Sequence, residues 1–261
     1  MPEEYTLLEY YSNYRGNFKG YLKTAWADRH LELDRSLVDI NRKEDASILD
    51  LGCGTGTVAL YLACKLGGKG KVLGIDINQE RLLCARERLK LMQAEIKTAL
   101  NCEFSSKNLF QLSPENKFDL IYMEETFHHL EPRLKAVRKI AATLKKNGIL
   151  IISEVNALNF FMQALLIKRR GLKTIINKTD ERGQVVLYGN ERILPSSTLK
   201  WLFNQSGLKH VSTRYLRIFH SSFARNFDRY LELMSLERKL IKLNIFRYLF
   251  AIHYNMIFIK T

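Results

Sequence analysis

A glycine-rich turn carries the clearest chemical signal in the sequence. Residues 48–56 read Ile-Leu-Asp-Leu-Gly-Cys-Gly-Thr-Gly and are followed directly by a segment of helical periodicity. Glycines reach backbone angles closed to other residues and let a ligand approach the main chain without a Cβ in the way. A helix N-terminus then presents free amides to that ligand. The pattern predicts a strand, a tight turn and a helix around a small molecule, although dinucleotide-binding folds use a related turn.

Further polar residues follow two later apolar runs. Residues 72–77 read Val-Leu-Gly-Ile-Asp-Ile, and the carboxylate of Asp76 can accept two hydrogen bonds from a vicinal diol. Glu124, Glu125, His128 and His129 come directly after the run Phe118–Met123. Histidine is the side chain whose unperturbed pKa suits proton transfer near neutral pH. These residues are therefore the candidates for acid–base chemistry.

Alternating strand-like and helix-like segments must position these groups. Short apolar runs alternate with segments of helical spacing, which favours a parallel sheet with helices on both faces. The expected strands are Ser47–Leu51, Lys71–Ile75, Cys102–Ser105, Phe118–Met123 and Gly148–Glu154. The expected helices are Thr57–Leu66, Gln79–Leu91 and Pro132–Leu144.

The alternation is interrupted after Glu154. Residues 157–195 are apolar and then basic, and residues 222–250 form an amphipathic, basic helical segment. A helix over 197–206 and strands over 211–219 and 254–260 complete the pattern. We therefore expect an N-terminal helical cap (1–45), a ligand-binding core (46–156) and a basic C-terminal part (157–261) that covers the substrate and completes the sheet.

The charge is concentrated in the last part of the chain. The net charge is +14, and residues 157–261 hold 18 basic and 6 acidic side chains, which gives +12. This asymmetry indicates an anionic partner, which is nucleic acid, an anionic membrane surface or a phosphorylated substrate. Neither an export signal nor a membrane-spanning run is visible. The four cysteines lack zinc-like clustering, which predicts reduced thiols, a cytoplasmic protein and no metal.

Together these motifs resemble the class I S-adenosylmethionine-dependent methyltransferases over roughly residues 46–156. The first motif matches D-x-G-x-G-x-G, and the acid at 76 stands where the family binds the two ribose hydroxyls. Asn108 replaces the usual aspartate after the third strand. Residues 118–122 and 127–130 are similar to the F-D-x-V strand and the H-H-L turn, and residues 144–150 to an altered L-K-P-G-G segment.

The resemblance implies an α/β fold, a Rossmann-like seven-stranded sheet with helical insertions in the C-terminal part. The last strand is expected to insert antiparallel beside residues 211–219. The implied cofactor is S-adenosyl-L-methionine, and the implied reaction is direct SN2 methyl transfer. A base is needed only if the acceptor must lose a proton, and His128 and Glu124 are the catalytic candidates. The implied cofactor-binding residues are Asp50, Gly52, Cys53, Gly54, Gly56, Asp76, Ile77, Asn108, Leu109 and Met123.

The acceptor is less well defined. The Pro-Pro-Tyr type of signature found in methyltransferases of nucleic-acid bases or glutamine is missing after the fourth strand. The expected acceptor is small and hydrophobic or anionic, such as a biosynthetic intermediate or lipid precursor. The stretch 160–170 also fits peripheral contact with an anionic membrane. An RNA-directed methyltransferase and a catalytically inactive binding protein are the alternatives, and the sequence gives no indication of the oligomeric state.

Overall fold

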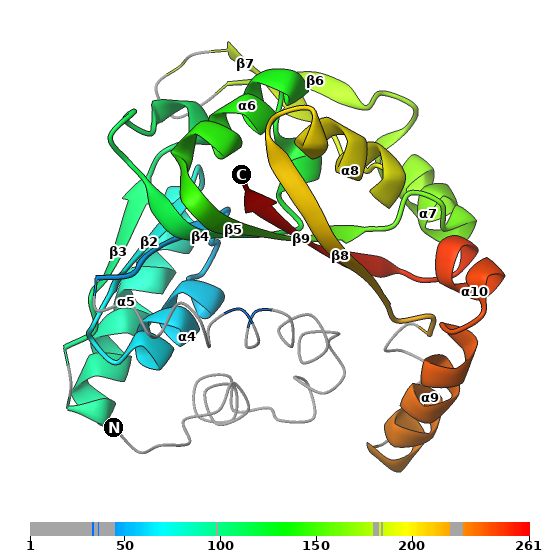
Figure 1. Ribbon diagram of the computed structural model, residues 1–261, viewed down its shortest axis with the longest axis horizontal. Helices are drawn as coiled ribbons and strands as arrows, with labels where there is room; N and C mark the ends of the chain where they lie inside the picture. The colour runs from blue at the N-terminus through cyan, green and yellow to red at the C-terminus, as the bar shows by residue number, and fades with distance from the viewer. Residues whose placement is uncertain are drawn as a thin grey trace.

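A computed structural model describes residues 33, 36, 45–97, 99–179, 183, 185–219 and 227–261 of the chain (Figure 1). The N-terminal helical cap expected over residues 1–45 falls outside these residues, except at Leu33, Ser36 and Asp45. Among the described residues, no helix combines the length and the apolar character needed to cross a membrane.

The described residues form a seven-stranded sheet in the order β3-β2-β1-β4-β5-β9-β8. The first five strands pair in parallel, whereas β9 runs antiparallel between β5 and β8. This arrangement confirms the Rossmann-like sheet and its inserted last strand. The strands are β1 (Ser47–Leu51), β2 (Lys71–Asp76), β3 (Cys102–Ser106), β4 (Phe118–Glu124), β5 (Leu144–Val155), β8 (Leu208–Leu216) and β9 (His253–Lys260).

Helices cover both faces of this sheet (Figure 1). Helices α4 (Thr57–Leu66) and α5 (Gln79–Ile96) lie on one face, and α6 (Arg133–Thr143) and α8 (Ser196–Asn204) lie on the other. Successive strand residues point to opposite faces, so Tyr122 enters the core under α4 while its neighbour Met123 enters the core under α6. Both side chains are fully buried, and this explains why the strands are apolar along their whole length.

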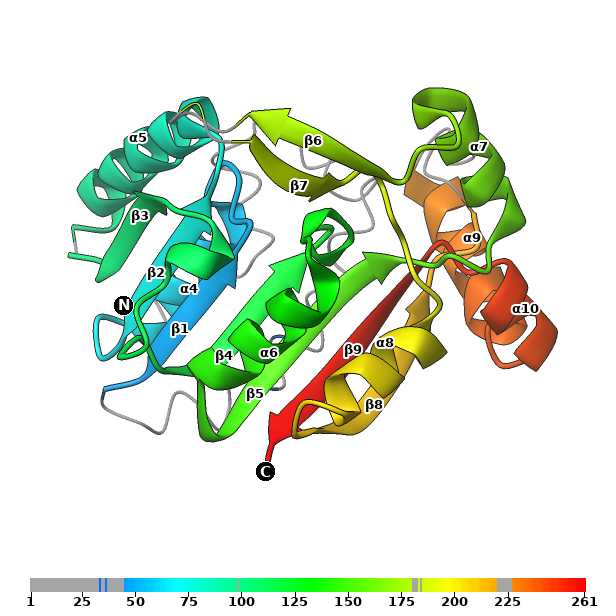
Figure 2. The ribbon, with the colours of Figure 1, turned by 90° about the horizontal axis from the view of Figure 1, so that it is seen from above.

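The C-terminal part contains two extra structural units. Helices α7 (Phe160–Arg170), α9 (Phe227–Leu240) and α10 (Asn244–Leu249) are the helical insertions. The second unit is a hairpin of β6 (Ile175–Thr179) and β7 (Val185–Gly189), which the sequence analysis does not anticipate. Figure 2 shows the hairpin lying across the carboxyl-terminal ends of the parallel strands.

Some boundaries differ from the expected ones for identifiable reasons. Strand β8 begins three residues earlier than expected because Leu208 already pairs with Lys260 of β9. The long helical segment expected over 222–250 contains two helices, α9 and α10, and residues 241–243 separate them.

Two buried asparagines fasten α7 to the end of the sheet. The Nδ2 group of Asn156 donates to the carbonyls of Tyr248 and Ala251 at 2.9 and 3.0 Å. That of Asn159 donates to the carbonyl of Phe250 at 2.8 Å, while its Oδ1 accepts from the amide of Met162 and caps α7. These contacts fix α7 beside α10 and so set the position of everything that α7 covers.

Replacing Asn156 by alanine tests this fastening. The variant leaves the carbonyl of Tyr248 without its side-chain donor and that of Ala251 with only the 3.3 Å bond from Asn159. We expect the free energy of unfolding to fall by about 1–3 kcal/mol. Urea denaturation measures this free energy of unfolding. Asn101→Ala, at an exposed asparagine, is the matched control and should change stability little. Equal stability of both variants would contradict the fastening role.

Candidate active site

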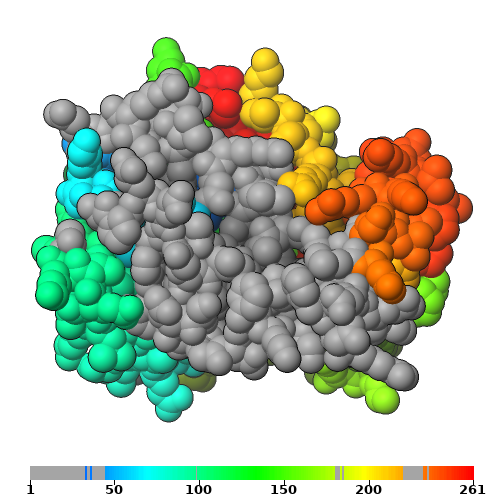
Figure 3. All heavy atoms as spheres, turned by 90° about the horizontal axis from the view of Figure 1, so that it is seen from below, coloured from blue at the N-terminus to red at the C-terminus, as the bar shows by residue number. Residues whose placement is uncertain are grey.

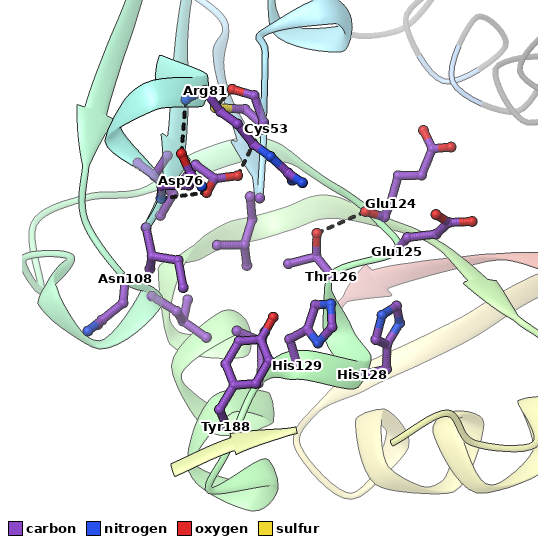
Figure 4. Close-up of a pocket in the computed structure, with 18 of the residues that line it drawn as sticks. Cys53, Asp76, Arg81, Asn108, Glu124, Glu125, Thr126, His128, His129 and Tyr188 are labelled. Atoms are coloured by element: carbon purple, nitrogen blue, oxygen red, sulfur yellow. Dashed lines mark hydrogen bonds between the residues drawn. The ribbon is translucent and has the colours of Figure 1, made fainter. Parts of the chain in front are cut away.

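A cavity of about 1700 Å³ opens at the carboxyl ends of the parallel strands. The glycine-rich turn after β1 and the end of β2 line one side, and the β4–η2 segment lines the other, where η2 is the 3-10 helix Phe127–His129. Side chains of α7 and the β6–β7 hairpin form its roof. Figure 4 shows that most of the predicted site residues surround this space.

The glycine turn is held against its neighbours by main-chain contacts. Gly52, with φ +80°, donates its amide to the carbonyl of Ile75 at 2.8 Å. A Cβ on Gly52 would overlap the side chain of Thr126, so only glycine lets these two loops meet. A Cβ on Gly54 would meet only Cδ of Arg81, at 4.0 Å, whereas Gly56 is packed against Phe104 and does not line the cavity.

Asp76 holds the turn and leaves its carboxylate at the cavity wall. Its Oδ2 accepts from the amide of Gly54 and its Oδ1 from the amide of Asn78, both at 2.8 Å. Each carboxylate oxygen has a further lone pair for a ligand hydroxyl. The neighbouring Ile77 is 48% exposed and lines the same cavity. It therefore offers an apolar surface on which a flat ring can pack.

The remaining predicted cofactor residues have different positions. The Oδ1 of Asn108 accepts from the amide of Phe110 at 2.9 Å and caps the 3-10 helix η1 (Leu109–Gln111), so one acceptor lone pair remains. Leu109 and Cys53 are buried residues of the cavity wall. Met123 is fully buried in the core under α6 and does not line the cavity, so its side chain is not brought to the site.

Asp50 makes this end of the cavity suited to a positive charge. Burial raises its pKa to about 8, with Glu124 and Asp76 adding to the rise. Its Oδ2 is enclosed and has no hydrogen-bond partner among the described residues. An unsatisfied buried carboxylate near two other acids is stabilised by a cationic ligand, and S-adenosylmethionine carries both an ammonium and a sulfonium group.

On the opposite side, His128 forms a buried pair with Glu154 at the end of β5. The Nδ1 of His128 lies 2.6 Å from Oε2 of Glu154, with 4% and 3% of the two side chains exposed. Oε1 of Glu154 accepts from the amides of Thr126 and Phe127 at 3.1 and 2.7 Å. Glu154 therefore holds the η2 turn and orients the imidazole, and His128 lines the cavity.

The pKa values of the pair move in opposite directions. Burial alone would lower the pKa of His128, but Glu154, Glu191 and Glu125 raise it above the usual value. Burial alone would raise the pKa of Glu154, but His128 and the donating amide of Phe127 lower it. Both shifts favour the imidazolium–carboxylate form of the pair.

His129 connects the η2 turn to the hairpin. Its Nδ1 lies 2.8 Å from the carbonyl of Gly189, and its ring stacks on Tyr188 with 4.6 Å between centroids. A Cβ on Gly189 would overlap the carbonyl of His128, so glycine is required for this close approach. His129 thus positions the roof.

Glu191 completes the roof beside the two imidazoles. Its carboxylate lies 3.4 Å from Nε2 of His128 and 4.0 Å from Nε2 of His129. One ligand atom from each of these three residues lies within 4.8 Å of the others, a spacing that could hold a divalent cation. The absence of a metal stays a prediction of the sequence analysis.

The structure does not bring the two predicted catalytic residues together. Oε2 of Glu124 accepts from the hydroxyl of Tyr122 at 3.0 Å, and its charge acts on Asp50. Figure 4 shows the side chain of Glu124 directed away from His128 and His129. Glu124 therefore belongs to the acidic, cofactor side of the cavity.

Glu154 is the functional residue that sequence reasoning missed. The signal was present, because an acid ends the apolar run 148–154 at the same edge as Asp76 and Glu124. Tyr188 of the hairpin and Glu191, two residues after it, were missed because the hairpin was not expected.

Glu154→Gln tests the buried pair through stability. A histidine with a raised pKa stabilises the fold below about pH 6.5, and this contribution is lost as the pH rises through its folded pKa. Glu154, whose pKa is lowered, stabilises the fold above about pH 4.3, and this stabilisation is lost as the pH falls through its folded pKa. At pH 6, where both contributions are present, we expect the variant to lose roughly 3–5 kcal/mol in chemical denaturation. An equal loss at every pH would contradict the ion pair.

Comparisons with known proteins agree with this geometry. A family model described as a methyltransferase domain matches residues 42–207. Ubiquinone biosynthesis O-methyltransferase of Bradyrhizobium diazoefficiens is 25% identical over 206 residues, which cover 78% of this chain and 73% of that protein. The chain spans only about half the length of several other curated relatives, from 42% to 53%.

Solved structures show the same fold. A putative sarcosine dimethylglycine methyltransferase from Galdieria sulphuraria superposes with a TM-score of 0.60 and 17% identity, over 90% of this chain and 85% of that one. Magnesium protoporphyrin IX methyltransferase from Synechocystis PCC 6803, solved with bound SAH, superposes with a TM-score of 0.56 and 15% identity, over 94% of this chain and 84% of that one. With the family model covering more than half of its residues, the chain belongs to the class I S-adenosylmethionine-dependent methyltransferases.

Proposed function

We propose that this protein transfers a methyl group from S-adenosylmethionine to a small, hydrophobic acceptor that carries negative charge. The observation that carries the proposal is that one cavity joins the acidic glycine turn to the His128–Glu154 pair. The Bradyrhizobium relative is named for ubiquinone biosynthesis, and this supports a small-molecule acceptor.

The residues of the turn fit the cofactor. Asp76 offers acceptors for a ribose diol and Ile77 offers an apolar face. Asp50 offers a buried carboxyl group with a raised pKa, and a bound cation would favour its ionised form. S-adenosylmethionine supplies an electrophilic methyl group on a sulfonium. The chain contributes alignment of this group and exclusion of water, which are the main requirements of a displacement at carbon.

His128 is placed to remove a proton from the acceptor. Glu154 holds Nδ1 and stabilises the imidazolium, so Nε2 is the nitrogen available toward the cavity and Glu191. Since its pKa is raised, His128 accepts a proton readily, but it must first be deprotonated by the medium. We assign the base to His128 and leave Glu124 on the cofactor side.

The roof of the cavity supports the acceptor class. Val155, Met162 and Leu166 are apolar lining residues, while Arg169 and Lys178 add cations to the same lining. We infer that residues 46–156 bind the cofactor and residues 157–261 cover the acceptor.

All four cysteines are free thiols, which supports a cytoplasmic location.

Asp76→Ala tests the cofactor assignment. Loss of two acceptors for the ribose hydroxyls should weaken S-adenosylmethionine binding by roughly a hundredfold or more, measured by calorimetry. Glu103→Ala, at an exposed acid of β3, is the control and should bind like the original chain. Unchanged affinity of the Asp76 variant would remove this assignment.

His128→Gln tests the base. We expect kcat to fall on the order of 10²–10⁴-fold, with cofactor affinity retained. In the original chain, kcat should rise with pH through a pKa above about 6.5, and Glu154→Gln should move that rise to lower pH. His210→Gln, outside the cavity, is the control. A rate abolished by EDTA and restored by Mn²⁺ would instead assign the activation to a metal.

Transfer of radiolabelled methyl into a cell extract tests the function itself. The extract is separated into organic, aqueous small-molecule, RNA and protein fractions. We expect label in the organic or small-molecule fraction, and none of it with the Asp76 variant. Label in RNA would instead support the RNA-directed alternative, and no label together with no cofactor binding would support the inactive binding protein.

A further inference from the structure

The helices around the cavity roof carry an unusual number of exposed apolar side chains. On α7, Phe160, Phe161 and Leu165 are 51%, 63% and 40% exposed, and Leu172, just after the helix, is 83% exposed. On α10, Ile245 is 60% exposed. The surface of a soluble protein rarely groups large apolar residues so densely, and such a group marks a site of contact with a protein, a ligand or a membrane.

Ring contacts join α7 and α10 into one surface. The ring of Phe250 lies 5.7 Å from that of Phe160 and 6.5 Å from that of Phe161, and Phe246 lies 5.3 Å from Phe250. Figure 2 shows α7 and α10 side by side at one end of the molecule, and Figure 3 shows α10 projecting there with α9. We call this surface the aromatic patch: Phe160, Phe161, Leu165, Leu172, Ile245, Phe246 and Phe250.

The two segments that carry the aromatic patch are rich in cations, although the neighbouring α9 also holds the exposed Glu232. Residues 157–179 contain five lysines and arginines and no acid, and residues 238–261 contain five more and no acid. Lys168, Arg169 and Arg170 form the last turn of α7. A shallow apolar face bordered by cations complements a bilayer surface that contains anionic lipids.

The same helix also lines the cavity. Met162, Leu166 and Arg169 of α7 face the cavity, whereas Phe161 and Leu165, about 100° around the helix from Met162 and Leu166, face outward. The aromatic patch therefore lies at the rim of the cavity roof. A molecule held in the outer part of a bilayer would be close to the opening.

We propose that the aromatic patch docks on an anionic lipid bilayer and that the acceptor enters the cavity from that bilayer. The second part rests on the proposed function and narrows its acceptor to a membrane-resident amphiphile. The first part stands independently, because docking needs no methyl transfer.

Vesicle sedimentation with the full chain tests the docking. The vesicles are phosphatidylcholine alone, or phosphatidylcholine with about a third phosphatidylglycerol. We expect binding to the mixed vesicles, weaker binding at high salt, and little binding to phosphatidylcholine. The double variant Phe160→Ser/Phe161→Ser should lose most of the binding to mixed vesicles. The double variant Lys168→Gln/Arg170→Gln should weaken that binding roughly tenfold or more.

Matched controls separate docking from folding. Leu83→Ser/Leu91→Ser removes two equally exposed apolar residues from α5, and Lys69→Gln/Lys97→Gln removes two exposed cations, so both should bind like the original chain. All variants should keep their affinity for S-adenosylmethionine, since none of these residues lines the cavity. Equal vesicle binding by the phenylalanine variant and the α5 variant would overturn the proposal.

RNA binding is the other outcome to be measured. Binding of a single-stranded RNA that is lost in the lysine and arginine variant, with no vesicle binding by the original chain, would also overturn the proposal. Vesicle binding without methyl transfer would uphold docking while the proposed function fails, so the two failures are distinguishable.

Discussion

A carboxylate buried at the end of β5 organises one side of the cavity. Glu154 accepts hydrogen bonds from two successive amides of the η2 turn and also pairs with His128. A buried charge is tolerated only when it is paired and its lone pairs are satisfied. The turn, the imidazole and the strand end are therefore fixed together, and the hairpin packs on the turn through His129.

Charged side chains of both signs line the cavity. Asp50, Asp76 and Glu124 lie at the strand ends, with Arg81 beside them, whereas the roof combines Arg169 and Lys178 with Glu191. The acids at the strand ends suit the cationic methyl donor of the family. The parallel sheet produces their grouping, since each of the three stands at the carboxyl end of a strand.

The sequence predicts the sheet, and most of the predicted cofactor residues line one cavity, because both depend on local patterns. The glycine turn, the acid at 76 and the alternating apolar runs are each visible within a few residues. The side of the cavity around His128 depends on contacts between distant segments. Glu154 meets a turn 26 residues earlier, and Gly189 meets His129 from 60 residues away. The two strands of the hairpin have five residues each and are mostly exposed, so although Val185–Gly189 is apolar they do not show the buried alternation that identifies the main sheet.

The protonation of His128 tests the central claim most directly. Nitrogen-15 NMR of the imidazole during a pH titration reports this protonation at a single residue. The account predicts a pKa above the ordinary value near 6.5, and a lower pKa in the Glu154→Gln variant. An ordinary or lowered pKa that the Glu154 substitution leaves unchanged would contradict the claim that this pair organises the site.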